Sequence, residues 1–250
     1  MEKVSLVAFQ DPKSPVSEAY RTIRTNLQFS GVDKELKIVE ITSSVPNEGK
    51  STVIASLAIV MAQAGKKVLL LDCDFRNPTQ HKLFSVTNKG MTNYMANGSD
   101  YHVFLHQVGL DNLYLFPGGP VAPNPSEILM SNKMQFFLDT ARAEYDFILI
   151  DTPPVMPVTD AAALCTKTDG VMLVVASGVD RPEIVQTAKV RLEQAGAHML
   201  GCILNKVRVS SGKYGYGSRY GYGYGYGYGY YYGDKGSDSQ EESNDVSNLD

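Results

Sequence analysis

Short apolar runs rich in β-branched residues alternate along the chain with longer stretches of helical character. Six runs have the length and composition of buried strands: Ile38–Ile41, Val68–Leu71, Leu113–Phe116, Phe147–Ile150, Val171–Ala176 and Met199–Leu204. Helices are predicted over Pro15–Phe29, Lys50–Ala64, Ser126–Ala143, Thr159–Cys165 and Arg181–Gln194. Continuous apolar strands with helices between them are typical of a parallel sheet covered on both faces. The predicted fold class is therefore α/β, doubly wound, with a mostly parallel sheet.

The same pattern divides the chain into three predicted parts. Residues 1–36 carry an N-terminal helix, residues 37–209 carry the alternating strands and helices, and residues 210–250 form a tail with an acidic end. Ten tyrosines crowd the tail, at Tyr214, Tyr216, Tyr220, Tyr222, Tyr224, Tyr226, Tyr228, Tyr230, Tyr231 and Tyr232. Glycines between them raise the entropic cost of regular structure. We therefore predict a disordered, Tyr/Gly-rich tail.

Composition and charge exclude several classes of protein. The 250 residues are 43% hydrophobic, which is enough to bury a core, and their formal net charge of −4 does not favour a nucleic-acid partner. Three cysteines without a CxxC pair favour a reducing compartment. The sequence has neither a secretory signal nor an apolar run long enough to span a bilayer. We expect a cytoplasmic protein that reaches a membrane only through a partner.

A phosphate-binding loop is indicated by the run SVPNEGKS, Ser44–Ser51, which has the spacing GxxxxGK[ST] with serine in place of the first glycine. The run follows a predicted strand and opens a predicted helix, as such a loop requires. Backbone N–H groups and the helix N-terminus then bind phosphate oxygens. Lys50 adds a positive charge at the β- and γ-phosphates, and Ser51 offers a hydroxyl to Mg²⁺. These flanks disfavour the alternative of an ordinary strand-to-helix turn.

Three carboxylates follow two further predicted strands. Asp151 ends the run FILID, the form of a Walker B motif, and Asp72 and Asp74 follow the run VLLL. Acids at the carboxyl ends of parallel strands point toward the ligand crevice, where Asp151 can support Mg²⁺. Each acid taken alone is less often, but can be, a solvated strand end. Together with the phosphate-binding loop they predict one phosphate and metal site.

The motifs together resemble the bacterial tyrosine kinase (BY-kinase) family, in particular its CpsD/CapB-type soluble kinases of capsule and exopolysaccharide systems. The resemblance rests on the runs PNEGKST, LLLDCDFRNP, ILIDTPP and EAYRTIR and on the Tyr-rich C-terminus. It implies a P-loop NTPase fold of the ParA/MinD type. It also implies an ATP-dependent protein-tyrosine kinase that autophosphorylates its tyrosine cluster in trans and so regulates polysaccharide synthesis and export.

The resemblance assigns roles to matching positions. It implies that Lys50, Asp72 and Asp74 are catalytic, with Asp72 accepting the proton of the tyrosine hydroxyl. ATP binding would involve Asn47, Glu48, Gly49, Lys50, Ser51, Thr52 and Asn205, and Mg²⁺ binding would involve Ser51, Asp74 and Asp151. An ordinary aspartate is a weak base toward a phenol, so Asp72 can act mainly by orienting the hydroxyl. For Arg76, contact with the phosphates and pairing with Asp74 are equally open.

The expected partners also follow from the resemblance. Glu18, Arg21 and Arg24 recur at i, i+3 and i+6, on roughly one face of a helix. By themselves they fit a solvated face with an intrahelical ion pair, but the resemblance implies that they dock on a neighbouring subunit and close a ring. It further implies a transmembrane adaptor of the polysaccharide co-polymerase type, which activates the kinase at the inner face of the cell membrane. A tyrosine phosphatase would oppose it.

Two other functions stay open, a ParA/MinD-like positioning ATPase and a nucleotide-gated scaffold without enzymatic activity. Val45 stands where the ParA/MinD proteins carry a signature lysine, which argues against the first. The tail can also be an adhesive or inert segment rather than a substrate. Asn47 replaces a glycine common in the kinase family, but asparagine tolerates a positive φ, so the loop is expected to form. Asn205 can equally be an ordinary strand-end residue.

Overall fold

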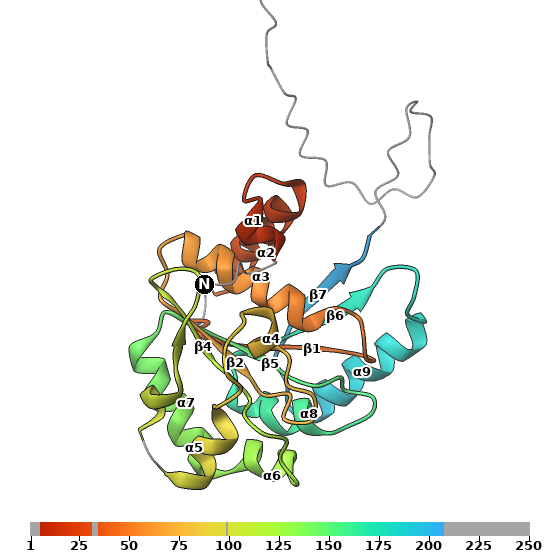
Figure 1. Ribbon diagram of the computed structural model, residues 1–250. Helices are drawn as coiled ribbons and strands as arrows, with labels where there is room; N and C mark the ends of the chain where they lie inside the picture. Colours follow the sequence, from red (N-terminus) through yellow and green to blue (C-terminus); the bar gives the residue numbers. More distant parts are fainter. Residues whose placement is uncertain (1–5, 32–34, 99, 208–250) are drawn as a thin grey trace, which may run out of the picture. The chain divides into compact units, whose positions relative to one another are not determined.

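The computed structural model describes residues 6–31, 35–98 and 100–207, in which seven strands form one sheet (Figure 1). The strands are β1 (Ile38–Ser43), β2 (Val68–Asp72), β3 (His106–Gln107), β4 (Leu113–Phe116), β5 (Phe147–Asp151), β6 (Gly170–Ala176) and β7 (Met199–Asn205), in the order β3-β4-β2-β5-β1-β6-β7. Every neighbouring pair is parallel except β3 and β4. The predicted mostly parallel sheet is confirmed, and the two-residue β3 is an element that the sequence pattern did not reveal.

Helices cover both faces of this sheet, as expected for a doubly wound fold (Figure 1). They are α1 (Val7–Gln10), α2 (Pro15–Ser30), α3 (Lys50–Gln63), α4 (Gln80–Leu83), α5 (Met91–Asn97), α6 (Pro125–Met130), α7 (Asn132–Glu144), α8 (Asp160–Leu164) and α9 (Pro182–Gln194), with 3₁₀ turns at Tyr101–Phe104 and Cys165–Lys167. The helix expected over Ser126–Ala143 is in fact two helices. Ser131 ends α6 in an extended conformation and caps α7 by accepting the N–H of Met134. Serine favours a helix cap over a helix interior, which explains the break.

The helix α3 is buried on every side. Its residues 53–62 are all buried, since one side packs on the sheet while α1 and α2 cover another. An apolar surface all round is typical of such a core helix. The N-terminal segment therefore packs on the same helix that the predicted phosphate-binding loop opens.

The strand order brings the expected site residues to one edge. The strands β2, β5 and β1 are neighbours and all parallel, so their carboxyl ends lie side by side. These ends lead to Asp72, to Asp151 and to the loop before α3. Ligands of open α/β sheets bind outside the carboxyl ends of the strands, which makes this edge the place to examine.

The structure tests the expectation about membrane-spanning segments only for the described residues, and it does not test the expectation about the tail. Within the ranges described above, no helix is long and apolar enough to cross a membrane. The tail of residues 210–250 and its ten tyrosines lie outside the described residues. Its predicted disorder therefore stays a prediction.

Asp169 ties the start of β6 to the start of β1. Its nearly buried carboxylate accepts the N–H of Lys37 at 2.9 Å, the N–H of Ile38 at 2.8 Å and an Nη2–H of Arg142 at 2.7 Å. Burial alone would raise the pKa of Asp169, but Arg142 and the two backbone groups outweigh it and hold the pKa below its ordinary value. The carboxylate thus joins three elements of the fold.

We expect Asp169→Ala to lower the free energy of unfolding by about 3 kcal/mol, because the mutation leaves buried donors unpaired. Urea unfolding at neutral pH measures the loss. A depressed pKa contributes stability above the ordinary value of about 4 and loses it as the pH falls further. The difference between wild type and variant should therefore shrink in acid, and a difference that grows in acid would contradict this assignment.

Candidate active site

The predicted phosphate-binding loop joins β1 to α3 and has the backbone that such a loop needs. Gly49 precedes α3 with φ of +94°, and Asn47 lies in the left-handed region with φ of +68°. The buried carboxylate of Glu48 accepts the N–H of Val45 at 2.7 Å across the loop. The expectation that the loop forms with asparagine at position 47 is confirmed.

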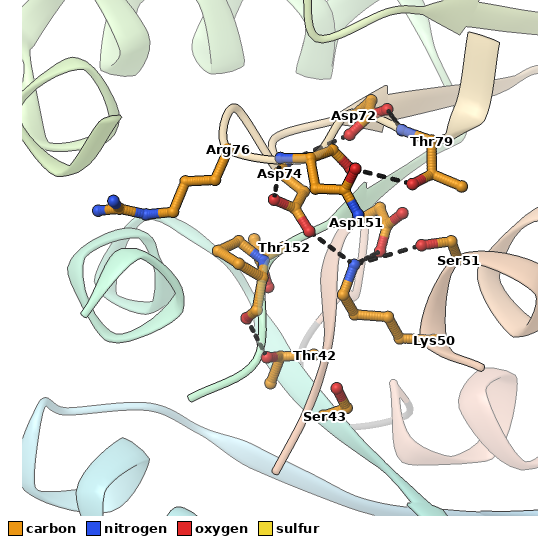
Figure 2. Close-up of polar contacts among 12 residues, drawn as sticks. Thr42, Ser43, Lys50, Ser51, Asp72, Asp74, Arg76, Thr79, Asp151 and Thr152 are labelled. Carbon is orange, nitrogen blue, oxygen red and sulfur yellow. Dashed lines mark hydrogen bonds and ion pairs between the residues drawn. The ribbon is translucent and has the colours of Figure 1, made fainter. Parts of the chain in front are cut away.

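Lys50 lies between the two carboxylates that the sequence placed at the metal site (Figure 2). Its Nζ is 3.0 Å from Asp74 Oδ2, 3.2 Å from Asp151 Oδ1 and 3.2 Å from Ser51 Oγ. Burial disfavours the charged ammonium, but Asp151 and Asp74 outweigh burial and raise the pKa of Lys50. The structure therefore brings together a cation, two carboxylates and a hydroxyl from three separate motifs.

Asp72 lies deeper than its neighbour Asp74. Its carboxylate is fully buried and accepts the N–H of Thr79 at 2.8 Å, of Gln80 at 2.9 Å and of Asp74 at 3.2 Å (Figure 2). Burial, followed by the negative charge of Asp151, raises the pKa of Asp72 to about 7. Asp72 therefore holds the loop that presents Asp74, and it titrates near neutral pH.

Two buried polar residues, one of them in the site, were missed by sequence reasoning. Gln80, fully buried at the start of α4, donates through Nε2 to Asp151 Oδ2 at 2.7 Å and to the carbonyl of Ser51 at 3.0 Å. Glu40, fully buried in the middle of β1, accepts the hydroxyl of Thr152 at 2.9 Å, and burial raises its pKa to about 8. The acid inside the apolar run IVEIT was a signal that the sequence did offer.

Arg76 pairs with Asp160 and not with Asp74, the partner considered from the sequence. Its Nε and Nη2 donate to the two oxygens of the buried Asp160 at 2.8 Å and 3.1 Å. Ser126 Oγ also donates to Asp160, at 2.5 Å. Figure 2 shows Arg76 directed away from Lys50. The expected alternative of a pair with Asp74 is thus replaced by a bidentate pair with Asp160.

A cavity of about 380 Å³ lies over these groups. It is lined by residues of the phosphate-binding loop and the first turn of α3, by the loop 74–79 and by the turn 153–158. A volume of this size falls within the range of small-molecule sites. Lys50, Ser51 and Asp74 line the cavity, whereas Asp72 lies beneath it.

Asn205 reaches the site from the end of β7. Its Nδ2 donates to the carbonyl of Glu48 at 2.8 Å, so the side chain contacts the loop itself. The contact with the phosphate-binding loop was not among the roles predicted for Asn205, and its predicted contact with a nucleotide stays a prediction.

The three residues of the predicted assembly motif make contacts within their own chain. On α2, Arg21 pairs with Glu18 and donates to the carbonyl of Pro12 at 2.6 Å. Arg24 donates to the carbonyl of Val60 at 3.2 Å. The carbonyl of Val60 is one of the last four carbonyl groups of α3, and these have no N–H partner within the helix. The predicted ring stays a prediction, but Arg24 has a second role as a cap.

We expect Arg24→Ala to lower the free energy of unfolding by about 1 kcal/mol, because it removes a charged donor from the C-terminal end of α3. Arg21→Ala is the matched control, since its pair with Glu18 and its hydrogen bond to Pro12 both lie at the surface and contribute little. Thermal unfolding would be compared at a protein concentration at which both variants have the same mass by light scattering. Equal melting temperatures for the two variants would contradict the capping role.

The loop, the parallel sheet and the two strand-end carboxylates define a P-loop nucleotide-binding protein. The sequence model of the AAA domain family matches residues 36–179. The cell-division ATPase MinD of Pyrococcus furiosus has the same fold, with a TM-score of 0.57 and 24% identity over 67% of this chain and 71% of that chain.

Other relatives identify the branch. The tyrosine-protein kinase YwqD of Bacillus subtilis is 42% identical over 85% of this chain and 90% of its own length. The tyrosine-protein kinase CpsD of Streptococcus agalactiae is 41% identical over 81% of this chain and 90% of its own. The crystal structure of the chimerical protein CapA2B2 matches with a TM-score of 0.78 and 39% identity over 83% of this chain and 92% of that one. The chain belongs to the bacterial tyrosine-protein kinases and is a protein-tyrosine kinase.

Proposed function

We propose that the chain transfers the γ-phosphoryl group of ATP to tyrosines of its own C-terminal cluster, in trans between copies, and so regulates capsular or exopolysaccharide synthesis and export. The observation that carries the proposal is the position of Lys50 between Asp74 and Asp151, at the wall of a cavity beside a phosphate-binding loop. A kinase of this type needs positioned positive charge more than covalent chemistry.

The residues present fit Mg²⁺ and ATP. Mg²⁺ prefers oxygen ligands and is usually held by one or two carboxylates together with phosphates. Ser51 Oγ, Asp74 and Asp151 supply a hydroxyl and two carboxylates around one point. These three side chains would hold the ion, which neutralises charge on the β- and γ-phosphates when bound. The loop residues Asn47 to Thr52 would bind the phosphates.

The family resemblance, together with the charges of the side chains, supports the following roles in the transfer. A bond forms between the tyrosine oxygen and the γ-phosphorus while the bond from that phosphorus to the β-phosphate oxygen breaks. Lys50 stabilises the negative charge on the leaving oxygens, and loop N–H groups do the same. Asp72, whose pKa is raised to about 7, would accept or orient the proton of the phenol. Asp74, held by the same loop, would keep the metal in place.

The proposed assembly has three further partners. Glu18, Arg21 and Arg24 would dock on a neighbouring copy and close a homo-oligomeric ring, since a head-to-tail interface can close into a cycle. A transmembrane adaptor of the polysaccharide co-polymerase type would recruit the chain to the inner face of the membrane and activate it. A tyrosine phosphatase would reverse the modification. The resemblance of the assembly motif and of the kinase motifs supports these partners.

The test is the intact mass of the full chain after incubation with Mg-ATP, with and without the cytosolic segment of a candidate adaptor. A ladder of phosphate additions that maps to Tyr214–Tyr232, and that Lys50→Met lacks, is the expected result. ADP release without a change in mass would instead indicate a MinD-like positioning ATPase. Binding of ATP with neither outcome, even with the adaptor present, would indicate a scaffold.

A further inference from the structure

Two neighbouring side chains at the end of β7 hold the outer side of the phosphate-binding loop. Asn205 Nδ2 donates to the carbonyl of Glu48 at 2.8 Å, and Lys206 Nζ donates to the carbonyl of Asn47 at 2.5 Å. The carbonyl of Asn205 accepts the N–H of Ser177 at 2.8 Å, which fixes this end of β7 against β6. Two successive carbonyls of the loop therefore face a strand end that is itself anchored in the sheet.

The direction of these carbonyls determines where the next N–H groups point. In a trans peptide the C=O and the following N–H point in opposite directions. With the carbonyls of Asn47 and Glu48 held toward β7, the N–H groups of Glu48 and Gly49 point away from it. Among the described residues, neither N–H donates to a protein acceptor. Free N–H groups before a helix are the groups that bind phosphate.

The cavity lies on the side toward which these N–H groups point. Asn47, Gly49 and Lys50 line it, whereas Asn205 and Lys206 do not. Asn205 and Lys206 therefore contact the loop from the side opposite the cavity. Their contacts with the loop carbonyls leave the phosphate side open.

Backbone strain lies at both ends of the contact between Lys206 and the loop. Asn47 has φ of +68° and Lys206 has φ of +57°, a region that glycine adopts without cost, that asparagine tolerates with some cost and that is unfavourable for lysine. Such conformations persist only where the surrounding structure holds them. Asn205 also packs tightly against the loop, because a Cβ at Gly49 would lie 2.3 Å from Asn205 Nδ2.

We propose that Lys206 and Asn205 are positioning residues of the phosphate-binding loop. They hold the carbonyls of Asn47 and Glu48 outward, so that the N–H groups that follow face the phosphates. The hydrogen bond from Lys206 to the carbonyl of Asn47 stabilises the positive φ at position 47, which a glycine would adopt without strain. The inference rests on the proposed function, since it takes a nucleotide phosphate as the occupant of the loop. It also assigns the amide of Asn205 to the loop rather than to the adenine base.

The experiment compares two ligands, Mg-ADP and magnesium pyrophosphate, which share the diphosphate but differ in the base. Dissociation constants would be measured by isothermal titration calorimetry on the full chain. Lys206→Met should weaken both ligands by about tenfold, because a charged donor is lost. Lys206→Arg should keep most of the affinity. Lys89→Met is the matched control, since Lys89 is exposed and makes no hydrogen bond or ion pair within the described residues.

A second variant tests the compensation directly. Glycine adopts a positive φ without strain, so Asn47→Gly in the Lys206→Met background should restore both affinities to within about twofold of wild type. A purely structural defect at the end of β7 would not be rescued from position 47. Asn205→Ala should weaken pyrophosphate as much as Mg-ADP, because its effect passes through the loop.

Each failure has its own signature. Equal affinities of Lys206→Met and Lys89→Met for both ligands would overturn the inference, as would a Lys206→Met defect that Asn47→Gly does not relieve. A loss of Mg-ADP binding without a loss of pyrophosphate binding in Asn205→Ala would show that its amide serves the base. A wild-type chain that binds neither ligand would instead overturn the proposed function.

Discussion

Lys50→Met is expected to reduce the rate of tyrosine phosphorylation by about 10²–10³-fold or more, the loss typical when one group that stabilises transition-state charge is removed. The ammonium is 3.0 Å from Asp74 and 3.2 Å from Asp151, so it already lies where the structure gathers the groups for phosphates and metal. Methionine keeps the length of the stem but carries no charge. The rate of phosphate incorporation would be followed by intact mass at saturating Mg-ATP.

The same change removes the counter-charge of two carboxylates that are almost inaccessible to solvent. Two buried carboxylates without their cation are costly, so the variant is expected to be less stable than the wild type. Circular dichroism and thermal unfolding must therefore confirm that the variant is folded at the assay temperature. Lys89→Met is again the control, and it should react at the wild-type rate. A folded Lys50→Met protein with more than about a tenth of the wild-type rate would place the active site elsewhere.

Asp72→Asn is expected to reduce phosphorylation by about 10²-fold or more, the range of a positioned acid or base. The carboxylate accepts three backbone N–H groups, on both of its oxygens. An asparagine has one acceptor oxygen, so its NH₂ must face a backbone donor. The loop that carries Asp74 would lose one anchor, and the proposed proton acceptor would lose its charge. Single-turnover rates and the KM for Mg-ATP, measured together, separate a chemical defect from weaker nucleotide binding.

The raised pKa of Asp72 gives a second readout of this prediction. Burial, then the charge of Asp151, raises the pKa to about 7, so the ionised form is scarce in mild acid. Wild-type phosphorylation should therefore fall as the pH drops below about 7, by about tenfold for each pH unit. The free energy of unfolding should instead rise as the pH falls through this window. Between the ordinary aspartate pKa of about 4 and the raised value of about 7, Asp72 binds more protons in the folded state than in the unfolded chain. A wild-type rate that is flat across this window would contradict a requirement for ionised Asp72.

The parts of the site that the sequence predicted are those that depend on local patterns. A phosphate-binding loop is a contiguous run between a strand and a helix, so the eight residues SVPNEGKS and their flanks are visible together in the sequence. Strand-end carboxylates such as Asp151 are similarly local. Because all parallel strands end at one edge, local patterns were enough to predict that Lys50, Asp74 and Asp151 meet.

The parts that the sequence did not predict depend on contacts between distant residues. Arg76 pairs with Asp160, 84 positions away, and no periodicity connects an arginine in a loop to an acid at the start of a short helix. Gln80 is likewise an unremarkable polar residue until the fold places its amide on Asp151. The prediction of one helix over Ser126–Ala143 was wrong for a different reason. The side chain of Ser131 caps a new helix, and this local hydrogen bond competes with continuation of the first helix.

The burial of α3 on every side limits how a signal from outside can reach the phosphates. Residues 53–62 are in contact with protein all round, and a packed interior resists local compression. Amide hydrogens in this stretch should be among the slowest of the chain to exchange with solvent. Arg24 of α2 contacts the C-terminal end of α3. A partner that displaced α2 would therefore not bend α3 one turn at a time. It must shift α3 as a rigid rod, so any control exerted there would reach the phosphate-binding loop in a single concerted step.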